Sequence, residues 1–424
     1  MVNDDTTGIQ KQNDKDESND IEKKSNKHQW LLDLISKKNQ SNNVKSKFNE
    51  NQNIDNDLIL KNKALILAPM VEQSDLPFRL LCRKYGVNLA YTPMIHARYF
   101  VMKQSYRNKM WMRTRTNTNT NTKTCMRMDE NGNQRNKLDR PLIAQIAGNN
   151  KEVLLQAAKM LETSVDAIDL NCGCPTKTAK RGRYGAFLLQ SNEHLVEIVR
   201  YLAANISCPL TVKVRLLPGS NGEIDIEKSL LLYEKLVNAG ISLLTVHGRT
   251  RFQKGSEMKA ADWNAIRRVV QHLGNRIPII ANGNIHTLDD VRQCIIQTGA
   301  HGVMSSESIL EYPPLFTETQ TKKVQFSRTG PGRIQIAREY LDLCRLYPPE
   351  NGGGGSGMQC IRMHLDVILH QDWKRRPQLR DTLLYTTNIE GLYDIITQIQ
   401  DYHNKDSHKV KDERLSWYLR HRTK

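Results

Sequence analysis

The segment Ile168-Asp169-Leu170-Asn171-Cys172-Gly173-Cys174-Pro175 joins an apolar strand to a tight loop that carries an amide and a thiol. In (β/α)8 enzymes the catalytic groups lie at the C-terminal ends of the barrel strands. A thiol in that position can act as a nucleophile or as a proton donor. The stretch that follows, Lys177 to Arg183, is strongly basic. The segment therefore predicts a reactive cysteine that faces a polyanionic substrate.

The same strand-and-loop unit recurs along the chain. Strands that helices cover on both faces have continuous apolar sequences. Eight such runs predict strands at Leu65–Pro69, Leu89–Pro93, Leu142–Ala147, Ala167–Asn171, Leu210–Arg215, Leu243–His247, Pro278–Asn282 and Gly302–Ser306. Amphipathic helices are expected between most of them, at Leu76–Tyr85, Asn150–Leu161, Asn192–Ala204, Ile226–Ala239, Trp263–Leu273 and Leu288–Thr298. Eight units in about 250 residues favour an α/β fold of the (β/α)8 TIM-barrel type over an open doubly wound sheet. No Gly-x-Gly-x-x-Gly follows the first strand, which weakens a dinucleotide-binding alternative.

Composition divides the chain into three parts. Residues 1–60 are rich in Asn, Asp and Lys and are expected to be disordered, with one transient helix at the apolar patch Trp30–Ile35. Residues 61–325 form the predicted barrel, interrupted by a low-complexity basic insert at residues 112–137. Residues 326–424 lack strand patterns, and they are expected to form a C-terminal helical domain that binds RNA.

The bulk composition argues against several classes of protein. The mean hydropathy is −0.59, and no apolar run approaches the ~20 residues of a membrane span. The eight cysteines are scattered, which favours a reducing compartment over a disulfide framework. Cys172 and Cys174 have no second pair at metal-binding spacing, so no metal site is expected. The first residues lack the features of a signal or transit peptide, which predicts a cytoplasmic protein with the nucleus as a second location.

Positive charge is concentrated in one part of the chain. The formal net charge is +17, and residues 98–140 hold 11 Lys and Arg against 3 Asp and Glu, a net charge of +8. This stretch is either a solvated insert or a surface that contacts phosphates, and the basic loop after Cys174 favours the second. Its flanks, Arg98–Lys109 and Arg135–Arg140, are the expected contact points. Further phosphate contacts are expected from a basic cluster of the helical domain: Lys374, Arg375, Arg376 and Arg380.

Polar residues lie at or near the ends of several predicted strands. Gln145, Lys213, His247 and Asn282 belong to four different strands. One such residue alone is usually structural, but together on one face they predict a site for a large anionic ligand. Gln and Lys on adjacent strands can hydrogen-bond a flat heteroaromatic ring, and a cation suits the electron-rich edge of a reduced flavin. Gly283 allows the backbone to approach a phosphate, in the loops that usually bind phosphate in this fold.

These motifs, in this order, resemble those of the flavin-dependent tRNA-dihydrouridine synthases. The resemblance covers residues 64–310 and is carried by Ala68–Val71 (APMV), Ala144–Gly148 (AQIAG), Asn171–Pro175 (NCGCP), Val212–Arg215 (VKVR), His247–Thr250 (HGRT) and Ala281–Ile285 (ANGNI). The run Arg181–Leu188 (RGRYGAFL) is most similar to the eukaryotic members that act at positions 16 and 17 of the tRNA D-loop. The tail from Cys360 to Gly391 resembles the same subgroup. Many members have a Gly-Arg pair after the last strand, where this chain has Ser306-Glu307.

The resemblance implies FMN as cofactor at the mouth of the barrel, NADPH or NADH as reductant, and tRNA as partner. The residues that would bind FMN are Pro69, Met70, Val71, Gln145, Lys213, His247, Asn282, Gly283, Asn284, Ser306 and Glu307. The first three would pack on the flavin ring, Gln145 and Lys213 would bond its polar edge, and the last five would bracket the phosphate. The residues that would contact the RNA are Asn171, Lys177, Arg181, Arg183, Arg215 and Arg249.

The resemblance also implies how uridine would be reduced. A D-loop uridine would be flipped into the pocket, because its C5–C6 bond is inaccessible while the base is stacked. Flavin N5 would give hydride to C6, and Cys174 would protonate C5 from the other face while Asn171 holds the edge of the uracil. A neutral thiol is adequate, because the proton is needed only when C5 becomes carbanion-like.

Two other functions stay open on the sequence. One is a flavin-dependent TIM-barrel oxidoreductase that acts on a small pyrimidine, which would not need a net charge of +17. The other is a non-catalytic tRNA-binding protein, against which the intact Cys174, Lys213 and His247 argue. No membrane contact and no stable protein partner are expected, and the chain is expected to be a monomer.

Overall fold

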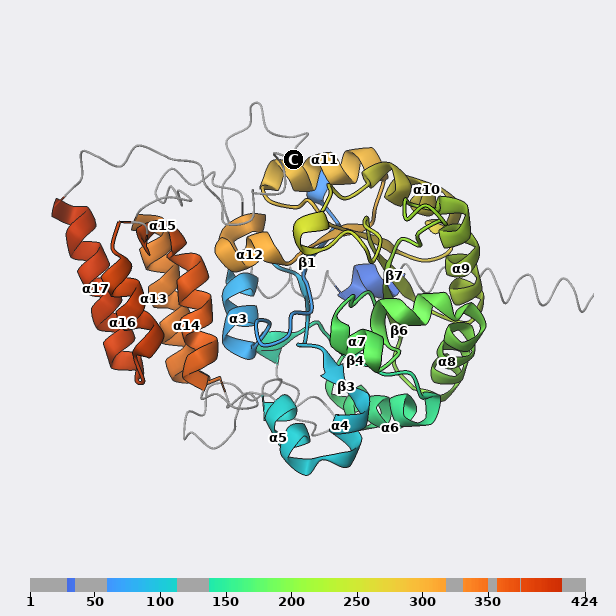
Figure 1. Ribbon diagram of the computed structural model, residues 1–424, viewed down its shortest axis with the longest axis horizontal. Coiled ribbons are helices and arrows are strands. Elements are labelled where there is room, and N and C mark those ends of the chain that lie inside the picture. Colours follow the sequence, from blue (N-terminus) through green and yellow to red (C-terminus); the bar gives the residue numbers. More distant parts are fainter. Residues whose placement is uncertain are drawn as a thin grey trace, which may run out of the picture.

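The computed structural model describes residues 29–34, 59–112, 137–317, 331–349, 357–373 and 375–405. Figure 1 shows two parts: a ring of strands enclosed by helices, and a group of C-terminal helices beside α3 (Leu76–Lys84) and α12 (Glu307–Glu311). Most of the 112–137 insert lies outside the described residues, so the prediction for it is not tested. Within the described ranges, no helix is long and apolar enough to cross a bilayer.

A closed parallel barrel forms the larger part. Its strands are β1 (Ala64–Leu67), β2 (Leu89–Tyr91), β4 (Leu142–Ala147), β5 (Ala167–Cys172), β6 (Leu210–Arg215), β7 (Leu243–His247), β8 (Ile279–Asn282) and β9 (Gly302–Ser305). Each strand pairs in parallel with its neighbours, and β1 pairs with both β2 and β9, while β2 also pairs with β4. A two-residue strand, β3 (Ile95–His96), pairs with the end of β4. These pairings close the ring and confirm the predicted TIM barrel.

Helices cover the outside of the ring. They are α6 (Lys151–Leu161), α8 (Asn192–Asn205), α9 (Ile226–Asn238), α10 (Trp263–Leu273) and α11 (Leu288–Thr298), together with α3. Several of these helices are capped at their N-termini by a side chain that accepts a hydrogen bond from the first helical turn. The capping residues are Asn150, Asp225, Asp262 and Thr287. The predicted helix bounds agree with these to within one residue at each end.

A short N-terminal helix closes the floor of the barrel. Residues 29–34 are helical, and Leu31 and Leu34 are buried against inward-facing strand residues such as Ile66 and Ile280. In Figure 1 this helix is the short blue segment inside the ring. The segment had been expected to be disordered with one transient helix, whereas its apolar side chains are packed in the fold. The rest of residues 1–58 lies outside the described ranges.

The C-terminal part is entirely helical where it is described. It contains α13 (Pro331–Leu346), α14 (Gly357–Ile368), α15 (His370–Trp373), α16 (Pro377–Tyr385) and α17 (Ile389–Lys405). It packs on the barrel through α13 against α3 and through α14 against α12. At this junction Arg333 is fully buried, and its Nη2 lies 3.0 Å from Oε1 of Glu311 on the barrel side. A buried ion pair of this kind ties the two parts together.

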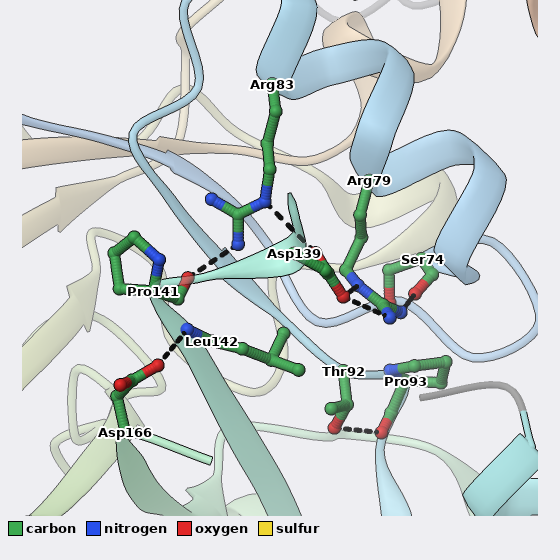
Figure 2. A network of polar contacts seen from close by, with 9 residues as sticks. All are labelled: Ser74, Arg79, Arg83, Thr92, Pro93, Asp139, Pro141, Leu142 and Asp166. Atoms are coloured by element: carbon green, nitrogen blue, oxygen red, sulfur yellow. Dashed lines mark hydrogen bonds and ion pairs between the residues drawn. The ribbon is translucent and has the colours of Figure 1, made fainter. Parts of the chain in front are cut away.

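A second buried ion network ties α3 to the residues just before β4 (Figure 2). Arg79 donates to Oδ2 of Asp139 from Nε at 2.8 Å and from Nη2 at 2.6 Å. Arg83 donates to the other carboxylate oxygen of Asp139 at 3.0 Å and to the carbonyl of Pro141 at 2.6 Å. The side chains of Arg79 and Asp139 are 0% and 2% exposed. One carboxylate therefore balances two buried guanidinium groups.

Candidate active site at the mouth of the barrel

The strand register brings the predicted polar residues to one end of the barrel. Asn171 on β5 is the register partner of Lys213 on β6. His247 on β7 is the register partner of both Arg215 on β6 and Asn282 on β8. All of these strands run in parallel, so their C-terminal ends meet at the same mouth. The site is thus assembled from at least four separate segments of the chain.

The side chains of Asn171 and Arg215 hold the loop that carries Cys174, through hydrogen bonds to the backbone of the loop. Oδ1 of Asn171 accepts from the backbone N–H groups of Gly173 at 3.1 Å and of Cys174 at 3.0 Å. Arg215 donates from Nε to the carbonyl of Gly173 at 2.9 Å. Gly185 has a φ of +64°, and a Cβ there would lie 2.7 Å from the carbonyl oxygen of Cys174. Only glycine fits at this position, which explains the Tyr-Gly-Ala sequence after the loop.

The two cysteines of the motif differ sharply in environment. Cys172 is fully buried on β5, and burial raises the pKa of its thiol well above the ordinary value. Cys174 is partly exposed at the mouth, and its Sγ lies 3.3 Å from Oγ1 of Thr176. A proton donor must be reachable by the substrate, so the structure favours Cys174 over Cys172 as the reactive thiol.

A chain of oriented amides lies beneath the Cys174 loop. Asn171 uses its oxygen for the loop, so its Nδ2 donates to Oε1 of Gln145 at 2.8 Å. Gln145 in turn donates from Nε2 to Oδ2 of Asp169 at 2.8 Å, while Thr211 donates to the other oxygen at 2.6 Å. An ionised carboxylate can only accept hydrogen bonds. Asp169 therefore sets the direction of both amides, and through them the position of Cys174.

Asp169→Asn is expected to lower turnover by up to about a hundredfold, because an amide at this position lets Gln145 and Asn171 reverse and release the loop. Cys174 itself is unchanged, so its reactivity toward a small thiol reagent should stay measurable. Thr211→Val is the matched control, since it removes one hydrogen bond to Asp169 without affecting the direction of the amides. Equal turnover of the two variants would contradict this role of Asp169.

The same substitution is expected to change the pH dependence of stability. Burial raises the pKa of Asp169 from 3.8 to about 6, although Thr211 and Gln145 oppose the rise. A raised folded-state pKa means that the stabilisation is complete below about pH 4 and is lost as the pH rises through about 6. The free energy of unfolding of the Asp169→Asn protein should lack this decline. Urea unfolding of both proteins between these pH values measures the difference, and parallel curves would contradict it.

Lys213 places a cation at the mouth. It is partly buried, and among the described residues it forms no hydrogen bond or salt bridge. Burial, with a smaller contribution from the nearby Arg215, lowers the pKa of Lys213 to about 8, although Asp169 opposes the shift. An unpaired buried cation is costly unless an anionic or electron-rich group binds beside it. Lys213 therefore fits a ligand with such an edge.

A small cavity of about 210 Å³ lies at the ends of β7, β8 and β9, and Arg215 and His247 are among its lining residues. Its lining includes the predicted phosphate-binding residues Asn282, Gly283, Asn284, Ser306 and Glu307. Gly283 has a φ of +112°, which favours glycine. Arg249 stabilises the lining of this cavity, because it donates to Nε2 of His247 at 3.0 Å and to Oδ1 of Asn284 at 2.8 Å. Burial and the neighbouring arginines hold the pKa of His247 well below its ordinary value, so the imidazole is neutral.

The remaining predicted residues fall into two groups. Pro69, Met70 and Val71 follow β1 at the mouth, where Met70 packs on the core and Val71 is 57% exposed. The cations of the loop after Cys174 are exposed and lie on or after the short helix α7 (Lys177–Arg181): Lys177, Arg181 and Arg183. By contrast, Arg215 and Arg249 make internal hydrogen bonds, so their contribution to the site includes holding its loops.

Some residues of the site were not predicted. Asp169 lies two positions before Asn171 on β5, and alternate residues of a strand face the same side. This alternation could have placed Asp169 on the same face as Asn171. Tyr184 packs in one cluster with Cys174 and Ala147, and no local pattern indicates that contact. The same holds for Thr211, which lies on the neighbouring strand.

The fold and the mouth define a (β/α)8-barrel protein that has a thiol, a lysine and an amide chain at the carboxyl ends of its strands. Residues 66–390 match the model of the family described as dihydrouridine synthase (Dus). The chain belongs to this family.

Curated relatives agree with the family match. The chain is 38% identical over 327 residues to a tRNA-dihydrouridine(16/17) synthase-like protein of Rattus norvegicus, with 77% of this chain and 64% of that protein covered. It is 35% identical over 318 residues to the tRNA-dihydrouridine(16/17) synthase of Saccharomyces cerevisiae, with 75% and 68% covered. The tRNA-dihydrouridine(20a/20b) synthase of the same yeast matches over 252 residues at 32% identity, with 59% and 61% covered. The chain thus spans under two thirds of the length of the rat relative.

Proposed function

We propose that this protein reduces uridine to 5,6-dihydrouridine in the D-loop of tRNA, at positions 16 and 17, with FMN as cofactor and NADPH or NADH as reductant. The observation that carries the proposal is the mouth itself, where the Cys174 loop, the amide of Gln145 and the cation of Lys213 converge from three adjacent strands. The longer match to relatives named for positions 16 and 17 supports the choice of those positions.

The residues present fit a flavin mononucleotide. Lys213 offers a cation to the electron-rich edge of the ring, and the cavity beside Gly283 has room for a phosphate among backbone groups. When bound, the flavin would supply the hydride for C6 of uracil, drawn from NADPH or NADH. The neutral His247, braced by Arg249, would border both ligands without adding charge.

The protein's own part in the reduction is to place the base and to deliver one proton. Saturation of the C5–C6 bond needs a hydride at C6 and a proton at C5, and Cys174 supplies the proton from Sγ. Its thiolate would regain a proton from solvent, since Cys174 is partly exposed. Asn171 uses one N–H of its amide for Gln145, which leaves the second N–H for a uracil carbonyl.

Contacts to the RNA backbone are proposed for the exposed cations that surround Cys174. Lys177, Arg181 and Arg183 lie on or beside α7, directly after the loop. The expected cluster in the helical domain is weaker than its sequence suggests. Arg376 is 3.1 Å from Asp372, and Arg380 donates to both carboxylate oxygens of Asp366. Internal acids thus neutralise two of its four cations, and Lys374 lies outside the described residues.

Lys213→Met is expected to weaken flavin retention about tenfold to a hundredfold, because it removes a charge-assisted contact worth ~1.5–3 kcal/mol. Flavin absorbance per protein after dialysis measures the loss, and the rate of flavin bleaching by NADPH measures the effect on reduction. Lys177→Met is the matched control, since it removes an exposed cation near the same mouth. Full flavin content and an unchanged bleaching rate in the Lys213 variant would contradict the assignment.

The function is tested by incubating the purified protein with NADPH and an unmodified tRNA transcript, followed by mapping of dihydrouridine at single positions. Released cofactor is identified by mass and absorbance. Reduction confined to positions 16 and 17 is the expected result. Reduction of free pyrimidines but not of tRNA would favour the small-molecule oxidoreductase. Bound tRNA without any reduction would favour a non-catalytic tRNA-binding protein.

A further inference from the structure

A line of aromatic rings leads away from Cys174 along the mouth of the barrel. Tyr184 belongs to the cluster that includes Cys174, and its ring meets His96 edge-on with centroids 5.2 Å apart. His96 stacks in turn on Tyr99, with centroids 4.5 Å apart and an interplanar angle of 28°. Tyr99 is 46% exposed although it is a large aromatic residue. The line continues from Tyr99 to Tyr106, with ring centroids 5.9 Å apart, but Tyr99 keeps a surface that no described protein group covers fully.

These rings border a cavity of about 680 Å³ that is separate from the one beside Gly283. Its lining comes from α4 (Ala97–Met102), from the start of α6 and from the segment Gly182–Tyr184, and no acidic residue is among the lining residues. Arg98 and Lys103 supply positive charge, and Nζ of Lys103 lies 5.0 Å above the ring of Tyr99. The positive end of the α6 dipole adds to the same field.

We propose that this cavity binds a second, unpaired nucleobase of the RNA, the base adjacent to the reduced uridine, by stacking it on Tyr99. Unpaired RNA bases are bound by stacking on aromatic rings, with cations placed near the backbone. The cavity volume falls within the range of about 300–1,000 Å³ that is typical of small-ligand pockets. Tyr184 lines this cavity and also packs in the cluster that includes Cys174, so the cavity lies beside the thiol that faces the reacting base. The inference rests on the proposed function and specifies how the same site holds its substrate.

Stacking of the adjacent base on Tyr99 would lower the energetic cost of flipping the uridine. A base that leaves its stack loses a few kcal/mol of stacking energy on one or both sides. A protein ring that takes the place of the lost neighbour offsets part of that cost. Tyr99 is therefore a substrate-binding residue, and its ring rather than its hydroxyl carries the effect.

The test uses the full chain and a tRNA transcript that carries 2-aminopurine next to the target uridine, since the fluorescence of this base falls when it stacks. The unaltered protein and Tyr99→Phe should quench the fluorescence equally. Tyr99→Leu should lose the quenching and bind tRNA roughly tenfold to a hundredfold more weakly. The slope of log affinity against log salt should not change, because no charge is removed. Flavin content should be equal in all three proteins.

Leu231→Ala is the control, because Leu231 is a 64% exposed apolar side chain on α9, outside the cavity and outside the helical domain. Equal quenching and equal affinity for Tyr99→Leu and the unaltered protein would overturn the proposal and leave the function intact. If the unaltered protein binds and quenches this RNA without reducing uridine, the proposal survives and the proposed function fails. If it does not bind tRNA at all, both fail.

Discussion

Cys174→Ala is expected to lower the rate of uridine reduction by ~10²–10⁴-fold, because it removes the group that protonates C5. Flavin content and tRNA affinity should be unchanged, since Lys213 and the exposed cations of α7 are untouched. Single-turnover measurement of dihydrouridine with saturating NADPH isolates this step from the binding of the reductant. The loss of rate should therefore appear in the chemical step alone.

Cys172→Ala is the matched control for that experiment. Cys172 is fully buried on β5, so its replacement removes a small packing group and leaves the mouth intact. Its turnover should stay close to that of the unaltered protein. Near-normal turnover of Cys174→Ala together with an inactive Cys172→Ala would reverse the assignment of the proton donor.

Asp139→Ala is expected to lower the free energy of unfolding by ~3–5 kcal/mol, because it leaves the buried Arg79 and Arg83 without their carboxylate. Urea unfolding followed by circular dichroism measures the change. The effect should be largest where α3 meets the short turn Lys137–Asp139 that precedes β4, since all the lost bonds join these two segments (Figure 2). Hydrogen exchange of the amides of α3 should therefore speed up more than exchange elsewhere in the barrel.

The control for Asp139 is a salt bridge on the surface. Glu223 pairs with Lys259 at 3.0 Å, but both side chains are more than 60% exposed, at 61% and 63%. Glu223→Ala should change the free energy of unfolding by no more than about 1 kcal/mol, because solvent already screens the pair. Similar losses of unfolding free energy in the two variants would contradict the claim that burial makes the Asp139 network more stabilising than a surface salt bridge.

Long periodic elements could be predicted from the sequence with good bounds. The predicted strands Leu142–Ala147, Leu210–Arg215 and Leu243–His247 and the helices Trp263–Leu273 and Leu288–Thr298 agree with β4, β6, β7, α10 and α11. Each has enough residues for its apolar period to show. The short elements β3, α4, α7 and α12 were not predicted, because a two-residue strand shows no pattern and helices of five or six residues complete fewer than two turns.

The candidate site could be predicted as a set of residues but not as an arrangement. Gln145, Asn171, Lys213 and His247 were predicted because each lies at or near the end of an apolar strand. Their contacts follow from the register of neighbouring strands, which depends on how the whole ring closes. The internal hydrogen bonds of Arg215 and Arg249 could not be predicted either, since their partners lie in loops that are distant in sequence.

The sequence by itself determined the barrel, the strand-end position of Cys174 and the family to which the chain belongs, because hydrophobic period and short motifs are local properties. Tertiary structure alone decided that Asp169 orients two amides, that Leu31 and Leu34 close the floor, and that Tyr184, His96 and Tyr99 line up beside the thiol. Each of these depends on contacts between segments far apart in the chain. The physical reason is that burial and hydrogen bonding act through space, whereas sequence patterns report only on neighbours along the backbone.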